Sequence, residues 1–364
     1  MKATNAAVMK EKNKKLILDL IREKHLSRAE LSQQTGLTKP ALSTIVDELL
    51  KENIVLEVPQ ITNEVGRRPK KLYLNREYLY FAGVNITRNH FEAGIINFYG
   101  EVLVQKRERM KESLTANEVI EQVCNMIARE ISELSIPKKK LFAIGVTTPG
   151  PVDRNNTTVL AAPNFNQWHF VNIGAQIKHH FHVPVYLENV SNAWAVCEKY
   201  FGTAKEVPNF MVVKIDEGIG SGIILGGSLY EGLNELGHTT INYNGILCEC
   251  GNRGCLETYA SIRSILNNTP YQTWTEAVDA EDTVLIEKEA EYLVPALVNV
   301  SNLFSLDIIV LASDIAYKSE QLLSILNARV REKSLNQKVS IVKTKITSSI
   351  QSAAVIALDK FFHL

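Results

Sequence analysis

The amino-acid sequence predicts an α/β protein that carries a small helical domain at its N-terminus. From Tyr80 onward, segments of strand-like composition alternate with segments of helical periodicity, which is typical of α/β folds. The first 76 residues instead show three consecutive helical patterns, and they hold 15 Lys and Arg against 9 Asp and Glu. The chain has 364 residues and no net charge. It is therefore long enough for two or three domains, and its basic excess lies in the first of them.

The composition indicates a globular protein without a membrane segment. Hydrophobic residues make up 45% of the chain, but they form no apolar run of about 18 residues, the length that a spanning helix needs. The N-terminus reads Met-Lys-Ala-Thr-Asn and lacks the apolar core of a secretory signal. We therefore expect a cytoplasmic protein that has no membrane partner.

Three helices are expected in the N-terminal segment. The first spans residues 13–24, where apolar residues recur at helical spacing: Leu16, Ile17, Leu20 and Ile21. Ser27 and Glu30 form a capping box that starts a second helix, which ends near Thr35. Gly36 supplies the following turn, and Thr38 caps a third helix. The buried face of this third helix is predicted to contain Leu42, Ile45, Val46, Leu49 and Leu50.

The third helix leaves small, hydrogen-bonding side chains exposed at its N-terminal end, as a helix that reads the major groove of DNA does. They are Thr38, Lys39, Pro40, Ser43 and Thr44. Two short strands, 54–58 and 70–74, flank a polar loop in which Arg67 and Arg68 lie between a glycine and a proline. Two such guanidinium groups can enter a narrow minor groove. The segment therefore predicts a winged helix-turn-helix that binds double-stranded DNA. The alternative is a helical bundle used for protein contacts.

A cluster of metal-ligand residues lies further along the chain. Three of the five cysteines, Cys248, Cys250 and Cys255, fall within eight residues, downstream of His238. In a cytosolic protein such a cluster is more often a metal site than a disulfide framework, and one imidazole with three thiolates is a common zinc set. Because these four ligands leave no open position, the zinc would be structural. The alternative is a glycine-rich turn with free thiols.

The body of the chain is expected to be built from alternating strands and helices. The expected strands span residues 80–86, 91–98, 141–147, 183–187, 210–215, 221–225 and 307–311. The expected helices span residues 116–134, 191–201 and 346–362. The last of these is apolar, so we expect it to pack back on a preceding lobe.

Several motifs carry a family resemblance. They are Thr-Pro-Gly-Pro-Val-Asp at 148–153, Glu188-Asn189, Glu235-Leu236-Gly237-His238 and the cysteine segment 248–257. Together with the N-terminal segment, they make the sequence resemble the ROK family of repressors and sugar kinases over nearly the whole chain, and the xylose repressors of that family most over 237–261. The resemblance implies a two-lobed, actin-like body of the RNase H-like sugar-kinase type, and a homodimer or tetramer. We expect a DNA-binding domain at 1–76, a first lobe at 77–187 joined by helix 346–364, and a second lobe at 188–345.

The resemblance also implies a sugar site. The family's sugar contacts fall on Asn189, Glu235, His238 and Glu257, and Val190 occupies the position of the kinases' catalytic aspartate. Carboxylates and carboxamides suit this role because they hydrogen-bond neighbouring sugar hydroxyls, and such a site discriminates strongly against analogues that lack a hydroxyl. The alternative for the two glutamates is ordinary solvent-exposed charge.

The phosphate-handling positions of the family's kinases are altered in this sequence. Val190 cannot accept a proton, and Asn85 stands for an aspartate. Asp216 and Glu217 replace an uncharged Gly-Thr pair that would receive phosphate, and residues 311–314 lack an expected glycine pair. Carboxylates at these positions repel ATP, whereas phosphoryl transfer requires a base and open phosphate-binding turns.

These changes predict a sugar-responsive transcriptional repressor without kinase activity. Its effector is expected to be xylose or another monosaccharide. Val190 removes one hydrogen-bonding contact to the sugar. Xylose is favoured because a pentose, which lacks the C6 hydroxymethyl group, loses less binding from this change than a hexose does. The alternatives are a sugar kinase with a fused DNA-binding head, and a DNA-binding regulator that acts independently of any ligand.

Overall fold

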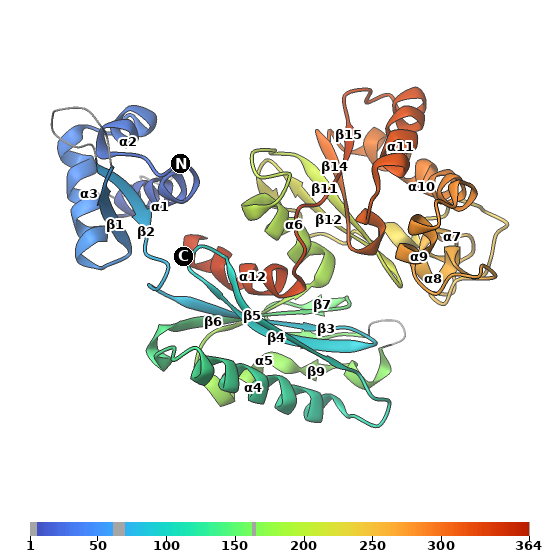
Figure 1. Ribbon diagram of the computed structural model, residues 1–364, viewed down its shortest axis with the longest axis horizontal. Helices are drawn as coiled ribbons and strands as arrows, with labels where there is room; N and C mark the ends of the chain where they lie inside the picture. Colours follow the sequence, from blue (N-terminus) through green and yellow to red (C-terminus); the bar gives the residue numbers. More distant parts are fainter. Residues whose placement is uncertain (1–5, 61–69, 162–164, 364) are drawn as a thin grey trace.

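The computed structural model describes residues 6–60, 70–161 and 165–363. It consists of a small N-terminal head and two larger lobes, each of which is built on a five-stranded sheet. Figure 1 shows the head at the left, the first lobe below and the second lobe at the right. The predicted α/β class, with a winged helix-turn-helix before a two-lobed body, is confirmed.

The head contains three helices and one antiparallel strand pair. They are α1 (Ala6–Lys24), α2 (Arg28–Thr35), α3 (Lys39–Lys51), β1 (Val55–Pro59) and β2 (Lys70–Leu74). The apolar faces of these elements meet in one core, whose fully buried side chains include Ile17, Ile21, Leu31, Val46 and Leu49. The core keeps the three helices in a fixed arrangement, so the exposed residues of α3 are presented on a rigid support.

The helix ends in the head follow the predicted capping chemistry. The Ser27 hydroxyl accepts a hydrogen bond from the Glu30 amide at 3.3 Å, and the Glu30 carboxylate accepts one from the Ser27 amide at 2.7 Å. Gly36 ends α2 with a φ of 69°, a conformation that glycine adopts without steric cost. The Thr38 hydroxyl accepts from the Ala41 amide at 3.4 Å and starts α3.

The first helix begins at Ala6 rather than at Asn13, the start that the apolar spacing indicates. The additional turns lie alongside α3 through charged contacts. Lys10 Nζ lies 2.6 Å from a carboxylate oxygen of Glu48. Lys14, just inside the predicted span, continues this row, with Nζ 3.1 Å from a carboxylate oxygen of Glu52. Because these partners are polar, hydrophobic periodicity carries no signal for this part of the helix.

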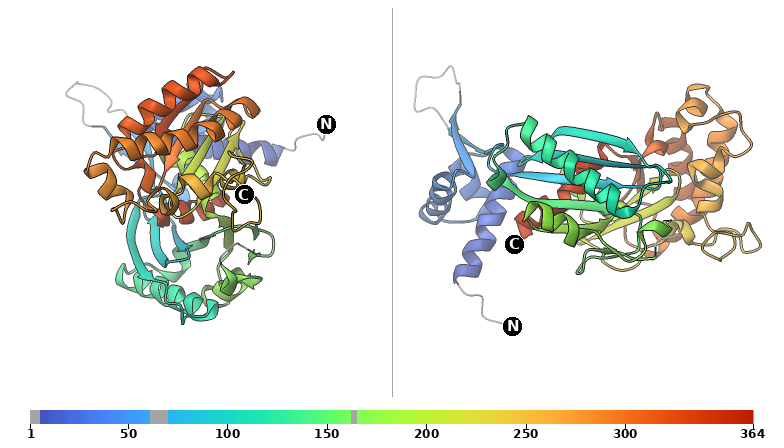
Figure 2. Two further views of the ribbon diagram at one scale, coloured as in Figure 1. Left: turned by 90° about the vertical axis from the view of Figure 1, so that its right-hand side faces the viewer. Right: turned by 90° about the horizontal axis from the view of Figure 1, so that it is seen from below.

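The sheet of the first lobe has the strand order β10-β6-β3-β4-β5. Its strands are β3 (Tyr80–Ile86), β4 (His90–Asn97), β5 (Val102–Arg109), β6 (Leu141–Thr148) and β10 (Val185–Asn189). The pairs β3–β4 and β4–β5 are antiparallel, whereas β3–β6 and β6–β10 are parallel. Helices α4 (Ala116–Glu133) and α5 (Ile173–Phe181) cover one face, and α12 (Ser349–His363) covers the other (Figures 1 and 2).

The sheet of the second lobe has the order β13-β12-β11-β14-β15. Its strands are β11 (Phe210–Ile215), β12 (Ile219–Leu225), β13 (Ser228–Leu229), β14 (Ile308–Ala312) and β15 (Ser340–Lys343). The sequence of antiparallel and parallel pairs is the same as in the first lobe, so the body consists of two copies of one topology. Helix α6 (Val190–Phe201) packs on β11 and β12, and α11 (Glu320–Lys333) packs on β15 and on α10 (Thr283–Leu303).

Shorter elements complete the lobes. A three-stranded sheet is formed by β7 (Val152–Asp153), β8 (Thr158–Val159) and β9 (Val171–Asn172). The short helices are α7 (Glu257–Ala260), α8 (Ile262–Ile265) and α9 (Trp274–Asp279), and the 3₁₀ turns are η1 (Lys138–Lys140), η2 (Asn166–Trp168), η3 (Leu236–His238) and η4 (Asp314–Ala316). No helix of residues 6–60, 70–161 and 165–363 combines the length and the apolarity needed to cross a membrane.

The last helix packs directly on the backbone of the first sheet. A β-carbon added to Gly83 of β3 would lie 2.5 Å from the carbonyl oxygen of Ile350, and one added to Gly145 of β6 would lie 2.0 Å from that of Ala353. Real side chains do not tolerate such distances, so these two glycines allow α12 to rest on the sheet. The segment that the sequence predicts to pack back therefore does so on β3 and β6.

Candidate functional site

The cluster of His238, Cys248, Cys250 and Cys255 is brought together in space. One ligand atom from each residue lies within 4.8 Å of all the others. Cys248 Sγ is 3.6 Å from His238 Nδ1, and Cys250 Sγ is 3.7 Å from Cys255 Sγ. Two Zn–S bonds of about 2.3 Å at a tetrahedral angle place their sulfur atoms roughly 3.8 Å apart. The chemistry and the spacing of this group therefore fit a tetrahedral metal ion.

The loop that carries the three thiols is folded tightly around them. Isolated bridges pair Thr240 with Cys255 and Leu247 with Arg253. Gly251 and Gly254 have φ values of 90° and 71°, which other residues rarely adopt. A β-carbon on Gly254 would also lie 1.6 Å from the carbonyl oxygen of Asn242. Glycine is thus required at this position for the turn that brings the sulfur atoms together.

Asn189 lies where the first sheet meets α6. It is the last residue of β10, and its side-chain oxygen caps α6 by accepting from the Ser191 amide at 2.8 Å. The neighbouring Glu188 is buried and accepts from Arg154 Nε at 2.6 Å and from Asn192 Nδ2 at 3.0 Å. Its charge is compensated by these partners, so the first turn of α6 is held in place by a satisfied polar network.

Glu235 and His238 lie at the two ends of the 3₁₀ turn η3. Glu235 is exposed and precedes the turn, and the His238 amide donates to its carbonyl oxygen at 3.0 Å. The preceding residue, Asn234, donates from Nδ2 to Asn192 Oδ1 at 3.3 Å. The segment that carries Glu235 is thereby tied to the helix that begins at Asn189.

Glu257 is the first residue of α7 and lies next to the start of β12. It is half-buried, its Oε2 accepts from the Ile219 amide at 2.8 Å, and a β-carbon on Gly218 would lie 2.8 Å from the same oxygen. Glu257 also lines a cavity of about 540 Å³ together with Arg88, Glu217 and the cysteine loop, a volume in the range of small-molecule sites. Of the four predicted sugar contacts, Glu257 alone lines this cavity. In the part of the chain that the structure describes, no hydrogen bond joins the side chains of Asn189, Glu235 and Glu257 to one another.

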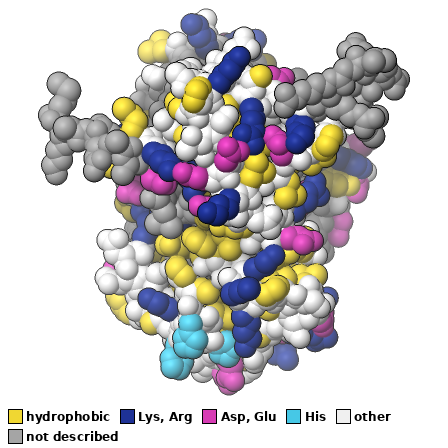
Figure 3. Space-filling model, turned by 90° about the vertical axis from the view of Figure 1, so that its left-hand side faces the viewer, with side chains coloured by type: hydrophobic (Ala, Val, Ile, Leu, Met, Phe, Trp, Pro, Cys, Tyr) yellow, Lys and Arg dark blue, Asp and Glu magenta, His cyan; other side chains and the backbone are white. Residues whose placement is uncertain are grey.

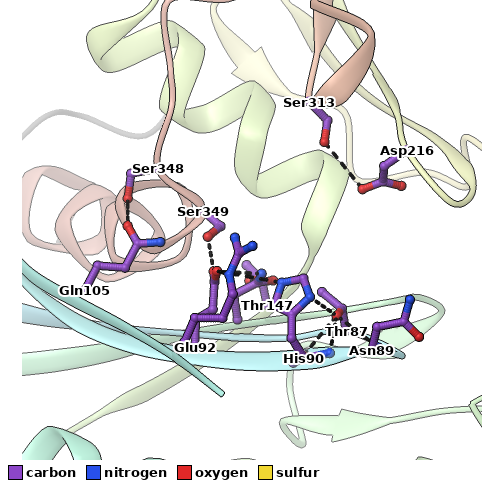
Figure 4. A network of polar contacts seen from close by, with 12 residues as sticks. Thr87, Asn89, His90, Glu92, Gln105, Thr147, Asp216, Ser313, Ser348 and Ser349 are labelled. Atoms are coloured by element: carbon purple, nitrogen blue, oxygen red, sulfur yellow. Dashed lines mark hydrogen bonds and ion pairs between the residues drawn. The ribbon is translucent and has the colours of Figure 1, made fainter. Parts of the chain in front are cut away.

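Asn85, one of the altered phosphate-handling positions, is buried. Its side-chain amide forms hydrogen bonds within the protein. Asn85 Nδ2 donates to Glu92 at 3.4 Å, and Thr147 Oγ1 donates to Asn85 Oδ1 at 3.0 Å. Glu92 is fully buried and also accepts from Arg107 Nε and Ser349 Oγ (Figure 4). Sequence reasoning missed this network, because its members come from β3, β4, β5, β6 and α12.

Asp216 is bound by groups of its own lobe. It forms an ion pair with Lys214, and it accepts from the Gly218 amide at 3.3 Å and from Ser313 Oγ at 3.5 Å (Figure 4). Burial raises the pKa of this carboxyl, but Lys214 and the hydrogen bonds outweigh the burial and hold its pKa below the usual value. Asp216 therefore stays ionised at neutral pH.

Two further carboxyl groups, Glu217 and Asp314, add to the acidic character of this region. Burial raises the pKa of both, and the nearby charge of Asp216 raises them further. The raised pKa values indicate that further negative charge is unfavourable at this position. A triphosphate placed here would meet the same repulsion.

The two lobes are connected directly at the edge of this acidic region. Asn89, in the turn between β3 and β4, donates a hydrogen bond to the carboxylate of Glu217, in the turn between β11 and β12. Arg88, next to Asn89, lines the same cavity as Glu217 and Glu257. Sequence patterns could not reveal this contact, because its partners are far apart along the chain.

The predicted DNA-reading residues lie together at the start of α3. Thr38, Lys39, Pro40 and Thr44 are exposed, and Ser43 is half-buried. The Thr44 hydroxyl donates to the Pro40 carbonyl oxygen at 3.0 Å, so its side chain has a defined orientation. Figure 3 shows the side of the molecule on which the head lies, where Lys and Arg side chains are interspersed with Asp and Glu.

The predicted wing residues Arg67 and Arg68 lie outside the described residues. The strands that flank them are present. β1 and β2 pair antiparallel from Val55 with Leu74 to Pro59 with Lys70. The described pairing ends with Pro59 and Lys70.

A helix-turn-helix head joined to two lobes of duplicated topology defines a regulator built on a sugar-kinase fold. The comparison with protein families agrees with this class, since the model of the ROK family matches residues 81–359. The chain belongs to the ROK family. The match covers both lobes and leaves the head outside it.

Individual relatives cover nearly the whole chain. The xylose repressor of Bacillus spizizenii is 32% identical over 91% of this chain and 89% of its own length. A putative xylose repressor of Caldicellulosiruptor is 29% identical over 97% of this chain and 95% of its own. A crystal structure of a ROK family transcriptional regulator, a homologue of the Escherichia coli Mlc protein, superposes with a TM-score of 0.81 at 25% identity over 97% of both chains.

Proposed function

We propose that this protein is a sugar-responsive transcriptional repressor whose two-lobed body has kept a sugar site and lost phosphoryl transfer. The observation that carries the proposal is the filled phosphate region. Asn85 is bonded to Glu92 and Thr147, and Asp216 is paired with Lys214. The two relatives described above, which cover both the head and the body, are repressors by name, and this supports a regulatory role.

The chain divides, in this proposal, into three functional domains. Residues 1–76 bind DNA, residues 77–187 form the first lobe together with helix 346–364, and residues 188–345 form the second lobe. The contacts of α12 with β3, β6 and β4 support the assignment of the last helix to the first lobe. This assignment means that the first lobe is assembled from two distant parts of the chain.

The head binds operator DNA through α3 and the wing. The exposed residues of the first turn, Thr38, Lys39 and Pro40, together with Ser43 and Thr44, contact base edges and phosphates in the major groove. A homodimer, or a tetramer built from two dimers, presents two heads to the two halves of a palindromic site, because protein and operator then share a two-fold axis. The operator is therefore expected to be palindromic.

The double substitution Arg67→Ala and Arg68→Ala is expected to weaken operator binding and to lower its dependence on salt. Each lost phosphate contact reduces the slope of log K against log salt by about 0.9. A dimer loses four such contacts, so the slope falls by about 3.6. Fluorescence anisotropy over a salt series measures it. The matched control is Arg331→Ala with Lys333→Ala, two exposed residues of α11 in the second lobe. An unchanged slope in the wing variant would reject the role of the wing.

The effector is a monosaccharide bound by Asn189, Glu235, His238 and Glu257, and xylose is the favoured candidate. The cavity at Glu257 and the close link between Asn192 and Asn234 support a site around β12. An effector that prefers the non-binding arrangement about a hundredfold changes operator affinity by about 2.7 kcal/mol. This change is sufficient to switch a promoter.

The metal of the cysteine cluster is a structural zinc ion. His238, Cys248, Cys250 and Cys255 fill its coordination, so the ion supplies rigidity and no reactive position. Because His238 ends the turn that Glu235 begins, and Cys255 is followed closely by Glu257, the metal holds two segments of the sugar site together.

The purified protein is expected to show no phosphorylation of xylose, glucose, N-acetylglucosamine or fructose by ATP. Val190 supplies no base, and three carboxylates, Asp216, Glu217 and Asp314, occupy the region of the phosphates. A coupled assay for ADP release measures this, with a ROK glucokinase as the positive control. Sugar-dependent ADP release would instead support a sugar kinase with a fused DNA-binding head.

A gel shift on the DNA upstream of the protein's own gene, with and without xylose, tests the proposed function as a whole. The expected result is a retarded complex that xylose releases. Complex formation that no sugar of the panel changes would support a ligand-independent regulator. The absence of any complex would contradict the proposal that the protein is a repressor.

A further inference from the structure

Helix α6 connects the candidate sugar site with the head. It begins at Val190, directly after its capping residue Asn189, and its last turn contains Tyr200. At about 1.5 Å per residue, these two positions lie roughly 16 Å apart along the axis. Nearly all of its side chains are buried against β11, β12 and α12. A short helix enclosed in this way moves as a rigid body.

The N-terminal end of α6 is tied to both sides of the sugar site. Asn192 bonds to Glu188 on one side and accepts from Asn234, which precedes Glu235, on the other. The helix backbone also rests on β12, because β-carbons on Gly220 and Gly222 would lie 2.2 Å from Ser191 Oγ and 2.3 Å from the Ser191 carbonyl oxygen. A shift of the segments that carry the sugar contacts therefore displaces the helix.

The C-terminal end of α6 contacts the head through one arginine. The guanidinium of Arg22, near the end of α1, lies 4.5 Å from the ring centre of Tyr200 and 4.8 Å from that of Phe362 of α12. Only 8% of the Arg22 side chain is exposed, and Nη2 lies 3.1 Å from Asp19 of the same helix. The Tyr200 hydroxyl donates to Asp359 at 2.8 Å, which fixes the tyrosine ring against α12.

The position of Arg22 depends on these rings. Among the residues that the structure describes, its Nε and Nη1 atoms are buried without a hydrogen-bond partner. A guanidinium whose N–H groups are only partly bonded is retained by the attraction between its charge and the faces of the aromatic rings. Because this attraction falls with distance, Arg22 follows the rings of Tyr200 and Phe362 when they move.

We propose that α6 transmits sugar occupancy to the DNA-binding head, and that Arg22, held by Tyr200 and Phe362, is the residue that positions the head. The inference rests on the proposed function and adds the route by which the sugar site acts on DNA. Sugar binding moves the first turn of α6, the helix carries the movement to Tyr200, and α1 changes its orientation because Arg22 follows the rings. The orientation of α1 sets the spacing of the two α3 helices of a dimer.

The experiment compares operator affinity with and without D-xylose in Arg22→Ala, Arg22→Lys and Tyr200→Leu. In Arg22→Ala and Tyr200→Leu, the ratio of the two affinities is expected to fall about tenfold, which corresponds to 1.4 kcal/mol of lost coupling. Xylose affinity measured by calorimetry without DNA is expected to stay at the wild-type value. Arg22→Lys retains an intermediate ratio, because a lysine keeps the charge but not the planar stacking.

The control variant is Arg129→Ala, whose side chain is 76% exposed on α4 and is expected to respond to xylose like the wild type. A wild-type ratio in both Arg22→Ala and Tyr200→Leu would overturn the route through α6 and leave the repressor function intact. If circular dichroism shows that Tyr200→Leu does not fold, the affinity ratios of the two Arg22 variants test the proposal. A wild-type protein that xylose does not release from its operator would overturn the proposed function, and the route with it.

Discussion

Cys255→Ser, or removal of zinc with a chelator, is expected to unfold the loop 239–256 and to abolish xylose binding. Burial cannot hold this loop in place, since Tyr243, Leu247 and Ile246 are 86%, 60% and 55% exposed. Structural zinc sites contribute about 10 kcal/mol or more of apparent binding free energy to folding. Without the metal, His238 and the segment that leads to Glu257 lose their common anchor. A lowered melting temperature, faster proteolysis in the loop and absence of xylose binding by calorimetry are the expected readouts.

The matched control for this substitution is Cys124→Ala. Cys124 is buried in α4, far along the chain from the cluster, and burial raises the pKa of its thiol to about 11. Cys124 is not part of the metal-ligand group of His238, Cys248, Cys250 and Cys255, so the variant is expected to keep one zinc ion per chain by atomic absorption. A metal-free wild-type protein that melts at the same temperature as the zinc-loaded protein would contradict the structural role of the cluster.

Glu257→Gln is expected to give a repressor that binds its operator normally and is not released by xylose. The substitution keeps the shape of the side chain and an oxygen for the Ile219 amide, but it removes the negative charge that accepts hydrogen bonds from sugar hydroxyls. Loss of one charged hydrogen-bonding group in a polar site costs several kcal/mol when its partner is left unpaired. We expect xylose affinity to fall about a hundredfold, or 2.7 kcal/mol, in a calorimetric titration.

Glu249→Gln separates a specific contact from a general effect of charge. Glu249 lines the same cavity, its side chain is 59% exposed, and it lies at none of the predicted sugar contacts. This variant is expected to bind xylose with wild-type affinity. Equal loss of affinity in both variants would indicate that the cavity attracts the ligand by charge alone, and wild-type affinity in Glu257→Gln would remove Glu257 from the sugar site.

The features that depend on neighbouring residues could be predicted from the sequence. The capping box of Ser27 and Glu30, the left-handed turn at Gly36 and the cap at Thr38 each involve residues a few positions apart. The convergence of the metal-ligand group is also local, because one glycine-rich loop and the turn before it carry all four ligands. The strand at 80–86 was predictable because its apolar residues form a continuous buried run.

Elements without a hydrophobic signature were not predicted. Strand β5 is mostly exposed along its length and ends in a charged segment from Gln105 to Arg109, so neither alternation nor an apolar run identifies it. Helices α7 and α8 have only four residues each, too few for helical periodicity to appear. These elements are stabilised by their pairing with neighbours, which composition does not report.

Contacts between distant segments could likewise not be predicted from the sequence. The carboxylates at 216 and 217 are visible as charges that repel phosphate, but the hydrogen bond from Asn89 to Glu217 depends on how the lobes fold and meet. The same holds for Arg22, which reads as one more basic residue of a DNA-binding segment and is instead enclosed between two aromatic rings of the body. Three-dimensional placement, and not residue type, defines these roles.

The seating of α12 on Gly83 and Gly145 has a consequence for how the protein is made. Ribosomes release a chain from its N-terminus, so β3 and β6 are synthesised long before the helix that covers them. The second lobe can complete its own sheet in the meantime, since all five of its strands precede residue 344. During translation, the apolar surface around Phe81 stays uncovered until α12 has left the ribosome, which makes this surface the expected point of engagement for chaperones in the cell.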